Sequence, residues 1–386
     1  MSGVLLVSTA EFTLKSQPVR QLLTRLLKRH IRFDLKRFGI ENCKITQSGG
    51  FLVVADIDDI EKIAEELSRV FGVAHVDACQ RIPLDLDEIS ACVVKLAQEK
   101  LKNGETFAIR ARNFEPSQLK GKEIEVRAGA DVLSQLPNGL RVNLSNPDHT
   151  LRIFYGAKEA FVSSARFNGP GGLPVGSQGR LLGLATDPAY ASLSFYLLMK
   201  RGAMVWPVIP NIPAILGETR PEEIIDGLRK LARLVPKKNY YIRLIEIDGD
   251  TSRMLDGMDR SLQTVFALRL VYRVLAHVIE TERVLGLVTA DAFGRNGLVS
   301  LKDLRVFEDI VKFPVYRPLL TLDTETTNRQ LAELGVLQFV RNETPKQVGK
   351  PGLSDVSAKD LGELEARLQV EDLARRIAAG STRIQI

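Results

Sequence analysis

The stretch "GRLLGLATDPAYASLSFYLLMKRGAMVWPV" (residues 179–208) decides the fold of the second half of the chain. An apolar segment, a tight turn and an amphipathic segment that ends in Lys-Arg-Gly predict a strand, a turn and a helix. In a nucleotide-binding α/β domain this turn is rich in glycine, because backbone N–H groups must approach a phosphate closely. Here the turn consists of Thr186, Asp187, Pro188, Ala189, Tyr190 and Ala191. The sequence therefore predicts the frame of a nucleotide-binding domain without its phosphate loop.

The chain from residue 180 to residue 340 alternates between apolar strands and amphipathic helices. Strands are predicted at 181–186, 204–210, 240–247, 284–290 and 313–320, and helices at 189–201, 221–234, 260–280 and 325–334. This alternation predicts a doubly wound parallel sheet. Residues 341–386 form a polar tail with a terminal helix over 358–379, for which Ser357 and Asp360 provide a capping box. The apolar side chains of that helix pack on the body of the protein or on a partner; they are Leu361, Leu364, Leu368 and Ile377.

The first 168 residues predict two smaller α+β domains. The order of strands and helices over residues 1–78 suggests a ferredoxin-like domain of the β-α-β-β-α-β type. A second α+β domain follows over residues 79–168, where a strand places Phe107 and Ile109 inward and arginines outward. Glycine and proline dominate residues 169–179, which predicts a linker. The predicted fold class is therefore α/β, with an α+β front half.

The composition argues against several classes of protein. The 386 residues are 45% apolar and 26% charged, as in a soluble globular protein, and no apolar run approaches the roughly 20 residues of a membrane span. Cys43, Cys79 and Cys92 are far apart and form no CxxC pair, so we interpret them as buried free thiols and predict no metal site. The first residues lack the pattern of a signal peptide. We expect a cytoplasmic protein that does not contact membranes.

The net charge of +6 is concentrated near the N-terminus, where nine lysines and arginines lie between residues 15 and 44 and only Asp34 and Glu41 oppose them. A helix is predicted over 18–39. Its apolar face is assigned to Val19, Leu22, Leu23, Leu26, Leu27 and Ile31. Arg25, Arg29, Arg32 and Lys36 recur at three- and four-residue intervals and therefore share the outer face. A concentrated basic face predicts a polyanionic partner, with nucleic acid as the default.

The order and spacing of seven segments resemble the 4-thiouridine synthetase (ThiI) family. The segments are "AEFTLK" (10–15), "FAIRAR" (107–112), "NLSNPDHTLRI" (143–153), "GPGGLPVG" (169–176), "LLMKRG" (197–202), "LVTADAFG" (287–294) and "PVYRPLLTLD" (314–323). The resemblance implies a ferredoxin-like domain, a THUMP domain and a PP-loop pyrophosphatase-type domain. It also implies that the first two domains bind tRNA, and that the third uses ATP to adenylate uridine 8 before a persulfide cysteine delivers sulfur.

Several positions depart from the family pattern. The PP-loop Ser-Gly-Gly-x-Asp-Ser is replaced by residues 186–191, where Pro188 lacks an N–H group, Asp187 adds a negative charge and Tyr190 adds bulk. Other positions of the family pattern also differ. This chain has Ile209-Pro210 where the family has His-Phe, Leu268 where it has lysine, Ala290 where it has glycine and Val299 where it has glutamine. Residues 337–386 contain no cysteine. We therefore interpret residues 186–191 as a degenerate nucleotide loop and predict no catalytic residue and no cofactor, with ATP and Mg²⁺ required only if sulfur transfer persists.

Residues predicted to contact RNA come from both front domains and the linker. They are Lys15, Arg25, Lys28, Arg29, Arg32, Lys36, Arg110, Arg112, Gly171 and Gly172. Basic side chains neutralise phosphates, and the backbone of a glycine-rich loop can approach a nucleic-acid chain closely. Two alternatives stay open, because Arg110 and Arg112 can instead pair with Glu123 or Glu125, and the glycine-rich segment can be a simple linker.

Further polar residues match the catalytic domain of the family. Asp291, Asp323, Arg269 and Arg273 form either a carboxylate-arginine site or, as we favour, an ion-pair network that holds helix to sheet. Three histidines lack metal-ligand spacing; we assign His30 to the basic face, and His149 and His277 to ordinary polar or core positions.

Three functions are compatible with these observations. The leading hypothesis is a non-catalytic tRNA-binding protein, which acts alone or presents tRNA to an active modifying enzyme or a second copy. The alternative is a divergent, ATP-dependent tRNA sulfurtransferase that makes 4-thiouridine at position 8. A third possibility is a factor that binds the ribosome or another structured RNA. DNA is not an expected partner.

Overall fold

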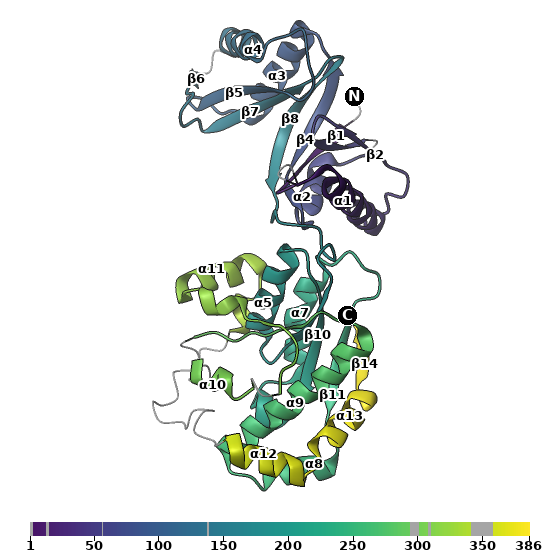
Figure 1. Cartoon of the computed structure of the whole chain (residues 1–386). Coiled ribbons are helices and arrows are strands. Elements are labelled where there is room, and N and C mark those ends of the chain that lie inside the picture. Colours follow the sequence, from purple (N-terminus) through teal and green to yellow (C-terminus); the bar gives the residue numbers. More distant parts are fainter. Residues whose placement is uncertain are drawn as a thin grey trace. The chain divides into compact units, whose positions relative to one another are not determined.

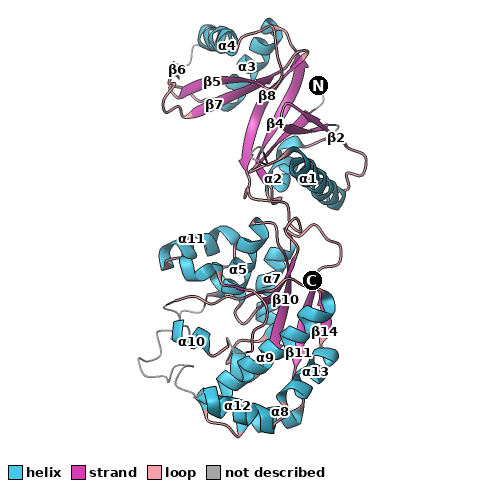
Figure 2. Ribbon diagram, viewed as in Figure 1, coloured by secondary structure: helices cyan, strands magenta, loops and turns pink. Residues whose placement is uncertain are grey.

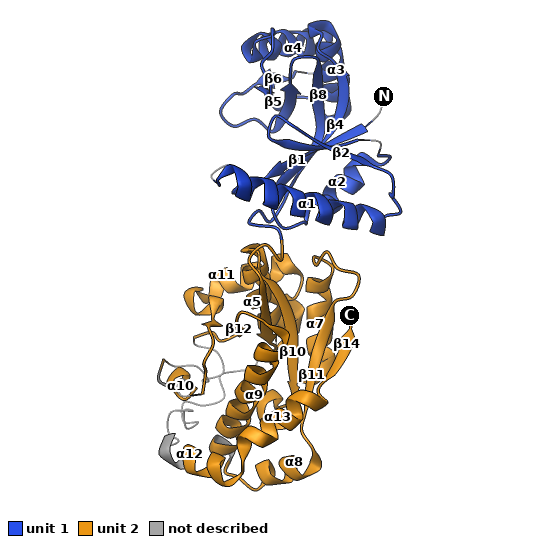
Figure 3. Cartoon of the chain, turned by 45° about the vertical axis from the view of Figure 1, so that its right-hand side comes forward, with its two compact units in different colours: residues 1–174 blue, residues 175–386 orange. Residues whose placement is uncertain are grey.

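The computed structural model describes residues 3–12, 15–55, 57–136, 139–293, 301–307, 310–340 and 358–386. The chain divides into two compact units, residues 1–174 and residues 175–386 (Figure 3). The first unit contains the basic helix and the second contains the parallel sheet, so each candidate site lies within one unit.

Unit 1 is built on one eight-stranded sheet with the strand order β2-β3-β1-β4-β8-β7-β5-β6 (Figure 2). Its strands are β1 (Gly3–Thr9), β2 (Lys44–Ser48), β3 (Phe51–Ala55), β4 (Val73–Pro83), β5 (Thr106–Asn113), β6 (Arg141–Val142), β7 (His149–Tyr155) and β8 (Glu159–Asn168). Its helices are α1 (Gln17–Arg37), α2 (Ile60–Ser68), α3 (Leu86–Lys100) and α4 (Gly121–Gln135). Helices α1 and α2 cover the half of the sheet around β1, while α3 and α4 cover the half around β5 (Figure 1). This order confirms the α+β prediction for the front half.

The long strands β4 and β8 join the two halves of this sheet. They pair antiparallel, with a register shift between Ala78 and Cys79. Before the shift, Val76 and Ala78 pack into the core beneath α1 and α2; after it, Ile82 packs into the core beneath α3 and α4. A bulge bends a strand and increases its twist, so one strand can serve two cores. The register shift falls between residues 78 and 79, where the sequence placed a domain boundary; that boundary stays a prediction.

Helix α1 packs on the sheet through a stripe at four-residue intervals. Leu23, Leu27, Ile31 and Leu35 are at most 2% exposed, as helical periodicity requires. Two of the residues predicted to be apolar contacts lie outside this stripe, because Val19 is 43% exposed and Leu22 is 57% exposed. The buried stripe begins only at Leu23, one turn after Val19, which corrects the predicted apolar face at its N-terminal end.

His30 lies on the buried side of α1 and not on the basic face to which the sequence assigned it. The side chain is 4% exposed, because position 30 follows Leu23 by two turns and therefore shares its side of the helix. Burial, with the nearby Arg29 charge as a second cause, lowers the pKa of His30 to about 4. The helix therefore holds this imidazole neutral.

The neutral imidazole predicts a loss of stability in mild acid. The pKa of His30 is about 4 in the folded protein against 6.5 in an unfolded chain, so only the unfolded chain takes up this proton as the pH falls from 6.5 to 4. We expect His30→Leu to remove this contribution. Between pH 7.5 and pH 5, unit 1 of the native protein should lose about 2 kcal/mol more unfolding free energy than unit 1 of the variant.

Urea unfolding followed by circular dichroism measures this difference. The chain has one tryptophan, Trp206, which lies in unit 2, so its fluorescence identifies the transition of that unit separately. Asp34, whose pKa burial raises to about 6, contributes with the opposite sign but is common to both proteins and cancels in the comparison. An equal pH dependence in both proteins would contradict the burial of a neutral His30.

Unit 2 contains a six-stranded sheet with the order β13-β12-β9-β10-β11-β14. Its strands are β9 (Arg180–Leu184), β10 (Met204–Asn211), β11 (Tyr241–Glu246), β12 (Leu287–Val288), β13 (Val315–Tyr316) and β14 (Thr382–Gln385). Its α-helices are α5 (Pro188–Lys200), α6 (Pro213–Leu216), α7 (Pro221–Ala232), α8 (Gly249–Asp256), α9 (Arg260–Glu282), α10 (Leu301–Arg305), α11 (Thr324–Leu334), α12 (Ala358–Arg367) and α13 (Val370–Gly380). Two short 3-10 helices, η1 and η2, occupy Pro318–Thr321 and Leu337–Phe339.

The strands from β13 to β11 are all parallel, which confirms the predicted doubly wound sheet. The chain order reverses beside β9, because β10 and β11 lie on one side of it and β12 and β13 on the other. In such sheets, ligands bind outside the carboxyl ends of the strands at this reversal. Here that place lies between the segment after β9 and the segment after β12.

The tail, residues 358–386 of the described chain, packs on the rest of unit 2. Leu361 and Ile377 are buried in the core that also contains the apolar face of α9. The single helix predicted over 358–379 is two helices, α12 and α13, separated at Gln369, whose φ is +49°. The sequence also did not predict β14, which pairs antiparallel with β11. The proposed capping box at Ser357 and Asp360 falls outside the residues whose side chains the structure describes.

Helix α9 corrects the statement that no segment has the length and apolar character of a membrane span. Residues 262–282 reach a mean hydropathy of 1.4, which by length and composition alone is enough to cross a membrane. However, 61% of the apolar window is buried inside unit 2, where α9 forms the centre of the core, so the same pattern arises from a core helix. Arg269 and Arg273 interrupt the segment, which is why it does not read as a continuous apolar run.

The three cysteines are free thiols. Cys79 is fully buried, and burial raises the pKa of its thiol, whereas Cys43 and Cys92 are half-buried. Among the residues that the structure describes, no three His, Cys, Asp or Glu side chains lie together in a way that could hold a metal ion.

Candidate nucleic-acid interface and nucleotide loop

The outer face of α1 presents a row of cations. Arg25, Arg29, Arg32 and Lys36 are all exposed, and within the described part of the chain none of them has an ion-pair partner. The only acidic residue of the helix, Asp34, pairs with Arg37 at 3.3 Å. The row extends over 12 residues, or about 16 Å along the helix axis at about 1.5 Å per residue. Of the other predicted contacts in this segment, Lys15 is exposed and Lys28 is half-buried.

Arg110 and Arg112 are exposed on β5, on the side predicted from the alternation of that strand. The guanidinium of Arg110 donates a hydrogen bond to the backbone carbonyl of Leu144. The guanidinium carbon of Arg112 lies 5.8 Å from the ring centroid of Phe51, a cation–π contact between β5 and β3. Glu125, one of the proposed acidic partners, instead accepts from the backbone N–H of Ala111 at 3.0 Å. The two arginines therefore remain exposed, but each is oriented by a contact within unit 1.

An aromatic cluster holds the two halves of unit 1 together next to Arg112. The ring of Phe51, on β3, lies 5.2 Å from that of Phe154, on β7, and 6.3 Å from that of Phe114, just after β5. Both pairs meet edge to face, with interplanar angles of 72° and 88°. Together with the shared strands β4 and β8, this cluster joins the half of the sheet that packs on α1 to the half that contains β5.

The glycine-rich segment after β8 turns back onto the start of β4. Gly171 and Gly172 have φ values of +69° and +71°, which glycine adopts without strain. The N–H of Gly171 donates to the carbonyl of Val73 at 2.8 Å, and the N–H of Gly169 donates to Ala74 at 2.8 Å. These two donors serve the fold, so the predicted contact of this loop with a nucleic-acid backbone stays a prediction.

The segment after β9 occupies the place where a doubly wound sheet binds its ligand. Asp187 is the N-cap of α5, and its Oδ1 accepts hydrogen bonds from the N–H groups of Ala189 at 2.8 Å and Tyr190 at 2.7 Å. These N–H groups are the ones that a helix N-terminus offers to a phosphate. The carboxylate therefore takes the position and the charge of a bound anion.

The rest of this segment is packed against its surroundings. Pro188 has no N–H group to donate, and Ala189 and Tyr190 are buried in a hydrophobic cluster with Leu319 and Leu331. A Cβ atom at Gly227 of α7 would lie 2.4 Å from the carbonyl oxygen of Pro188, so α7 closes tightly on this turn. Residues 186–191 as arranged here do not fit a phosphate group, because the N–H groups of Ala189 and Tyr190 are occupied, Pro188 has no N–H group and a like charge is present.

The facing segment after β12 is fixed by its own hydrogen bonds. Asp291 accepts from the hydroxyl of Thr289 at 2.6 Å and from Nε of Arg317 at 2.9 Å. Ser194 of α5 donates to the carbonyl of Thr289 at 2.6 Å, which ties the two segments together. Asp323 is the N-cap of α11 and accepts from the N–H of Thr326 at 2.6 Å.

Arg269 and Arg273 do not join these aspartates. Both contact Glu365 of α12: Arg269 donates to its two oxygens at 2.6 and 2.9 Å, and Arg273 donates at 2.7 Å. Arg273 and His277 also lie 3.2 Å and 3.0 Å from Glu371 of α13. The arginines thus hold the tail to α9. This corrects the favoured interpretation, in which they and the two aspartates form one ion-pair network that holds helix to sheet. His149 lies in unit 1, where it is 3.1 Å from Glu105.

Three family models match consecutive segments of the chain. They are the ThiI ferredoxin-like domain over residues 4–76, the THUMP domain over residues 84–165 and the model described as thiamine biosynthesis protein (ThiI) over residues 176–348. The chain belongs to the ThiI family. This membership, with its ferredoxin-like, THUMP and PP-loop domains, confirms the resemblance and the fold class inferred from the sequence.

Proteins named tRNA sulfurtransferases are similar to this chain over most of its length. The probable tRNA sulfurtransferase of Methanocaldococcus jannaschii is 27% identical over 361 residues, covering 90% of this chain and 91% of the relative. The tRNA sulfurtransferase of Thermoplasma volcanium is 28% identical over 333 residues, covering 86% of this chain and 67% of the relative. A crystal structure described as a 4-thiouridine synthetase–RNA complex with bound ATP matches with a TM-score of 0.83 at 20% identity, over 100% of both chains. This last likeness shows that the whole fold is shared.

Proposed function

We propose that this protein binds tRNA through unit 1 and functions in the formation of 4-thiouridine. The observation that carries the proposal is the row of exposed cations on α1, which lies in the same compact unit as a THUMP domain. The names of the relatives, tRNA sulfurtransferases, supply the class of RNA and the modification. A protein with this substrate acts in the cytoplasm.

The mode of binding follows from the residues present. Lysine and arginine side chains neutralise phosphates and release their counterions, so the affinity falls as the salt concentration rises. Double-stranded RNA offers side chains little access to its base edges, and proteins recognise it mainly by shape and backbone. We therefore infer that the cationic row on α1 and the exposed arginines of β5 contact the folded acceptor region of tRNA, with little dependence on its sequence.

We further propose that the chain does not itself adenylate the tRNA. The Asp187 carboxylate already occupies the N–H groups at the start of α5, and ATP would have to displace it with a charge of the same sign. The chain also has no cysteine in residues 337–386, where the family resemblance places the persulfide. Its role would then be to bind and present tRNA to an active modifying enzyme.

A second candidate function is favoured by the comparisons. The similarity to proteins named tRNA sulfurtransferases extends along most of the chain and covers the PP-loop domain. On this proposal the protein makes 4-thiouridine itself, with ATP bound in a rearranged site and with sulfur taken from another protein. This function requires Asp187 to release the N-terminus of α5.

Two measurements test these proposals. Deleting the gene should lower the 4-thiouridine content of cellular tRNA, measured by mass spectrometry of nucleosides. Unchanged content would contradict a role in this modification, and crosslinking would then identify another structured RNA as the partner.

In the second measurement, purified protein is incubated with tRNA, ATP, Mg²⁺ and sulfide. We expect retained tRNA without new thiouridine, whereas thiouridine formed by the protein alone would establish the second function.

A further inference from the structure

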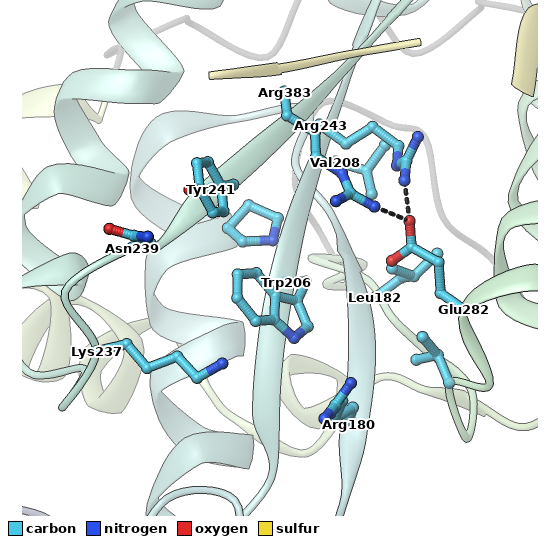
Figure 4. A pocket seen from close by; sticks show the side chains of 12 residues that line it. Arg180, Leu182, Trp206, Val208, Lys237, Asn239, Tyr241, Arg243, Glu282 and Arg383 are labelled. Carbon is cyan, nitrogen blue, oxygen red and sulfur yellow. Dashed lines mark hydrogen bonds and ion pairs between the residues drawn. The ribbon is translucent and has the colours of Figure 1, made fainter. Parts of the chain in front are cut away.

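A cavity of about 480 Å³ opens on the face of the unit 2 sheet beyond the end of α9 (Figure 4). Its lining includes Arg180, the first residue of β9, Trp206 near the start of β10, and Tyr241, the first residue of β11. In a parallel sheet these starting residues share one edge. The cavity therefore lies toward the amino ends of the strands, whereas residues 186–191 lie at the carboxyl ends.

The charges around this cavity do not balance. Four cations, Arg180, Lys237, Arg243 and Arg383, line it together with a single carboxylate, that of Glu282. Arg243 and Arg383 are directly opposite each other on β11 and β14, and like charges in that relation destabilise a sheet. Glu282 bridges both guanidiniums and neutralises one of them (Figure 4). A net charge of +3 on this lining is what an anionic ligand would complement.

The floor and one wall of the cavity are apolar and aromatic. Leu182 and Val208 are buried beneath it, while Trp206 and Tyr241 are half-buried at its side. The indole of Trp206 is supported by the ring of Tyr240, with 5.4 Å between the centroids. Lys237 lies 4.7 Å from the centre of the indole ring and brings an ammonium group next to the aromatic surface. The lining therefore combines a supported ring with cations within one cavity of ligand size.

We propose that this cavity binds a nucleotide. A planar base would stack on Trp206 and Tyr241, and its phosphate would be held by Arg180, Lys237 and the arginine pair. The same chemistry is offered by a free nucleoside monophosphate and by the terminal nucleotide of an RNA chain. The site is separate from the degenerate loop after β9, and the proposal does not depend on the function proposed above.

Fluorescence of Trp206 reports occupancy directly, because it is the only tryptophan of the chain and lies in the cavity wall. We expect at least one of AMP, GMP, CMP and UMP to quench it saturably, and nucleosides without phosphate to do so much more weakly. Arg180→Glu, which changes an exposed side chain, should weaken the effective nucleotide about tenfold or more, because it replaces a charge-assisted contact with repulsion. Lys237→Gln should act in the same direction.

Lys238→Gln is the matched control, because Lys238 is exposed beside Lys237 but does not line the cavity. Its affinity for the nucleotide should equal that of the native protein. Intact tRNA then identifies the source: quenching by a mononucleotide and also by tRNA indicates an RNA end, whereas quenching by a mononucleotide but not by tRNA indicates a free nucleotide. No saturable quenching by any mononucleotide or tRNA, or quenching that Arg180→Glu and Lys237→Gln leave unchanged, would overturn the proposal.

Discussion

Changing Arg25, Arg29 and Arg32 together to glutamate should abolish retention of tRNA at moderate salt. The three side chains are exposed, and none of them forms an ion pair within the described residues, so in the native protein their charges are available to phosphates. Loss of three charge-assisted contacts, each worth about 1.5 kcal/mol, together with new repulsion corresponds to a loss of affinity of more than about 100-fold. A gel-shift series with tRNA, a minihelix and an unrelated structured RNA measures the effect.

The control for this variant is a second triple change to glutamate, at Arg220, Arg229 and Arg253 of unit 2. These side chains are 61–78% exposed, and each pairs with an acidic residue nearby in the sequence. The control variant has the same net charge as the α1 variant, because each replaces three arginines with glutamate, but its changes do not affect α1. We expect this control to bind tRNA about as the native protein does, and both variants to keep their circular dichroism spectra. Equal tRNA binding by the α1 variant and the native protein would remove α1 from the interface.

Glu365→Ala should lower the unfolding free energy of unit 2 by about 3–5 kcal/mol. Arg269 is 1% exposed, and removing its partner leaves a guanidinium buried without a counter-charge. Burial by itself opposes the charge on Glu365, but hydrogen bonds from Arg269 and Arg273 outweigh it and lower the pKa of the carboxyl group. Urea unfolding followed by Trp206 fluorescence reports the stability of this unit.

Glu371→Ala provides the comparison for this prediction. Glu371 pairs with Arg273 at 3.2 Å but is 57% exposed, so we expect its loss to cost less than about 1 kcal/mol. Replacing both buried partners, as in Arg269→Met with Glu365→Leu, should recover much of the stability lost in Glu365→Ala, because no uncompensated charge then remains. Similar effects of Glu365→Ala and Glu371→Ala would show that the buried pair does not hold the tail to α9.

The main elements of the fold were predictable because each depends on a local pattern. The four-residue stripe of α1 and the alternation of strands and helices after Arg180 both follow from hydrophobic periodicity. Strand β14 was not predicted, because its four residues are too few to show a strand pattern. The break between α12 and α13 at Gln369 was not predicted either, because no neighbouring residue requires a positive φ there. His30 was assigned to the basic face because lysines and arginines surround it in the sequence. Its angular position on the helix, which it shares with Leu23, would have placed it on the buried side.

The sites were predictable only in part, for a related reason. The substitutions in residues 186–191 are visible in sequence, and Pro188 and Tyr190 indicate on chemical grounds that a phosphate is poorly accommodated. The sequence did not show that the Asp187 carboxylate accepts the hydrogen bonds of the N–H groups at the start of α5, because this depends on the geometry of the turn. The pairing of Arg269 with Glu365 and the gathering of cations around Trp206 join residues that are far apart in the chain, so spacing alone could not reveal them.

We propose that unit 1 binds tRNA while the loop after β9 cannot hold a triphosphate. A crystal structure of the protein grown with tRNA, ATP and Mg²⁺ tests both parts at once. We predict RNA phosphates beside α1, an Asp187 carboxylate still bonded to the N–H groups of Ala189 and Tyr190, and no nucleotide phosphate next to residues 186–191. A triphosphate ordered beside these residues, with Asp187 displaced, would contradict the central claim.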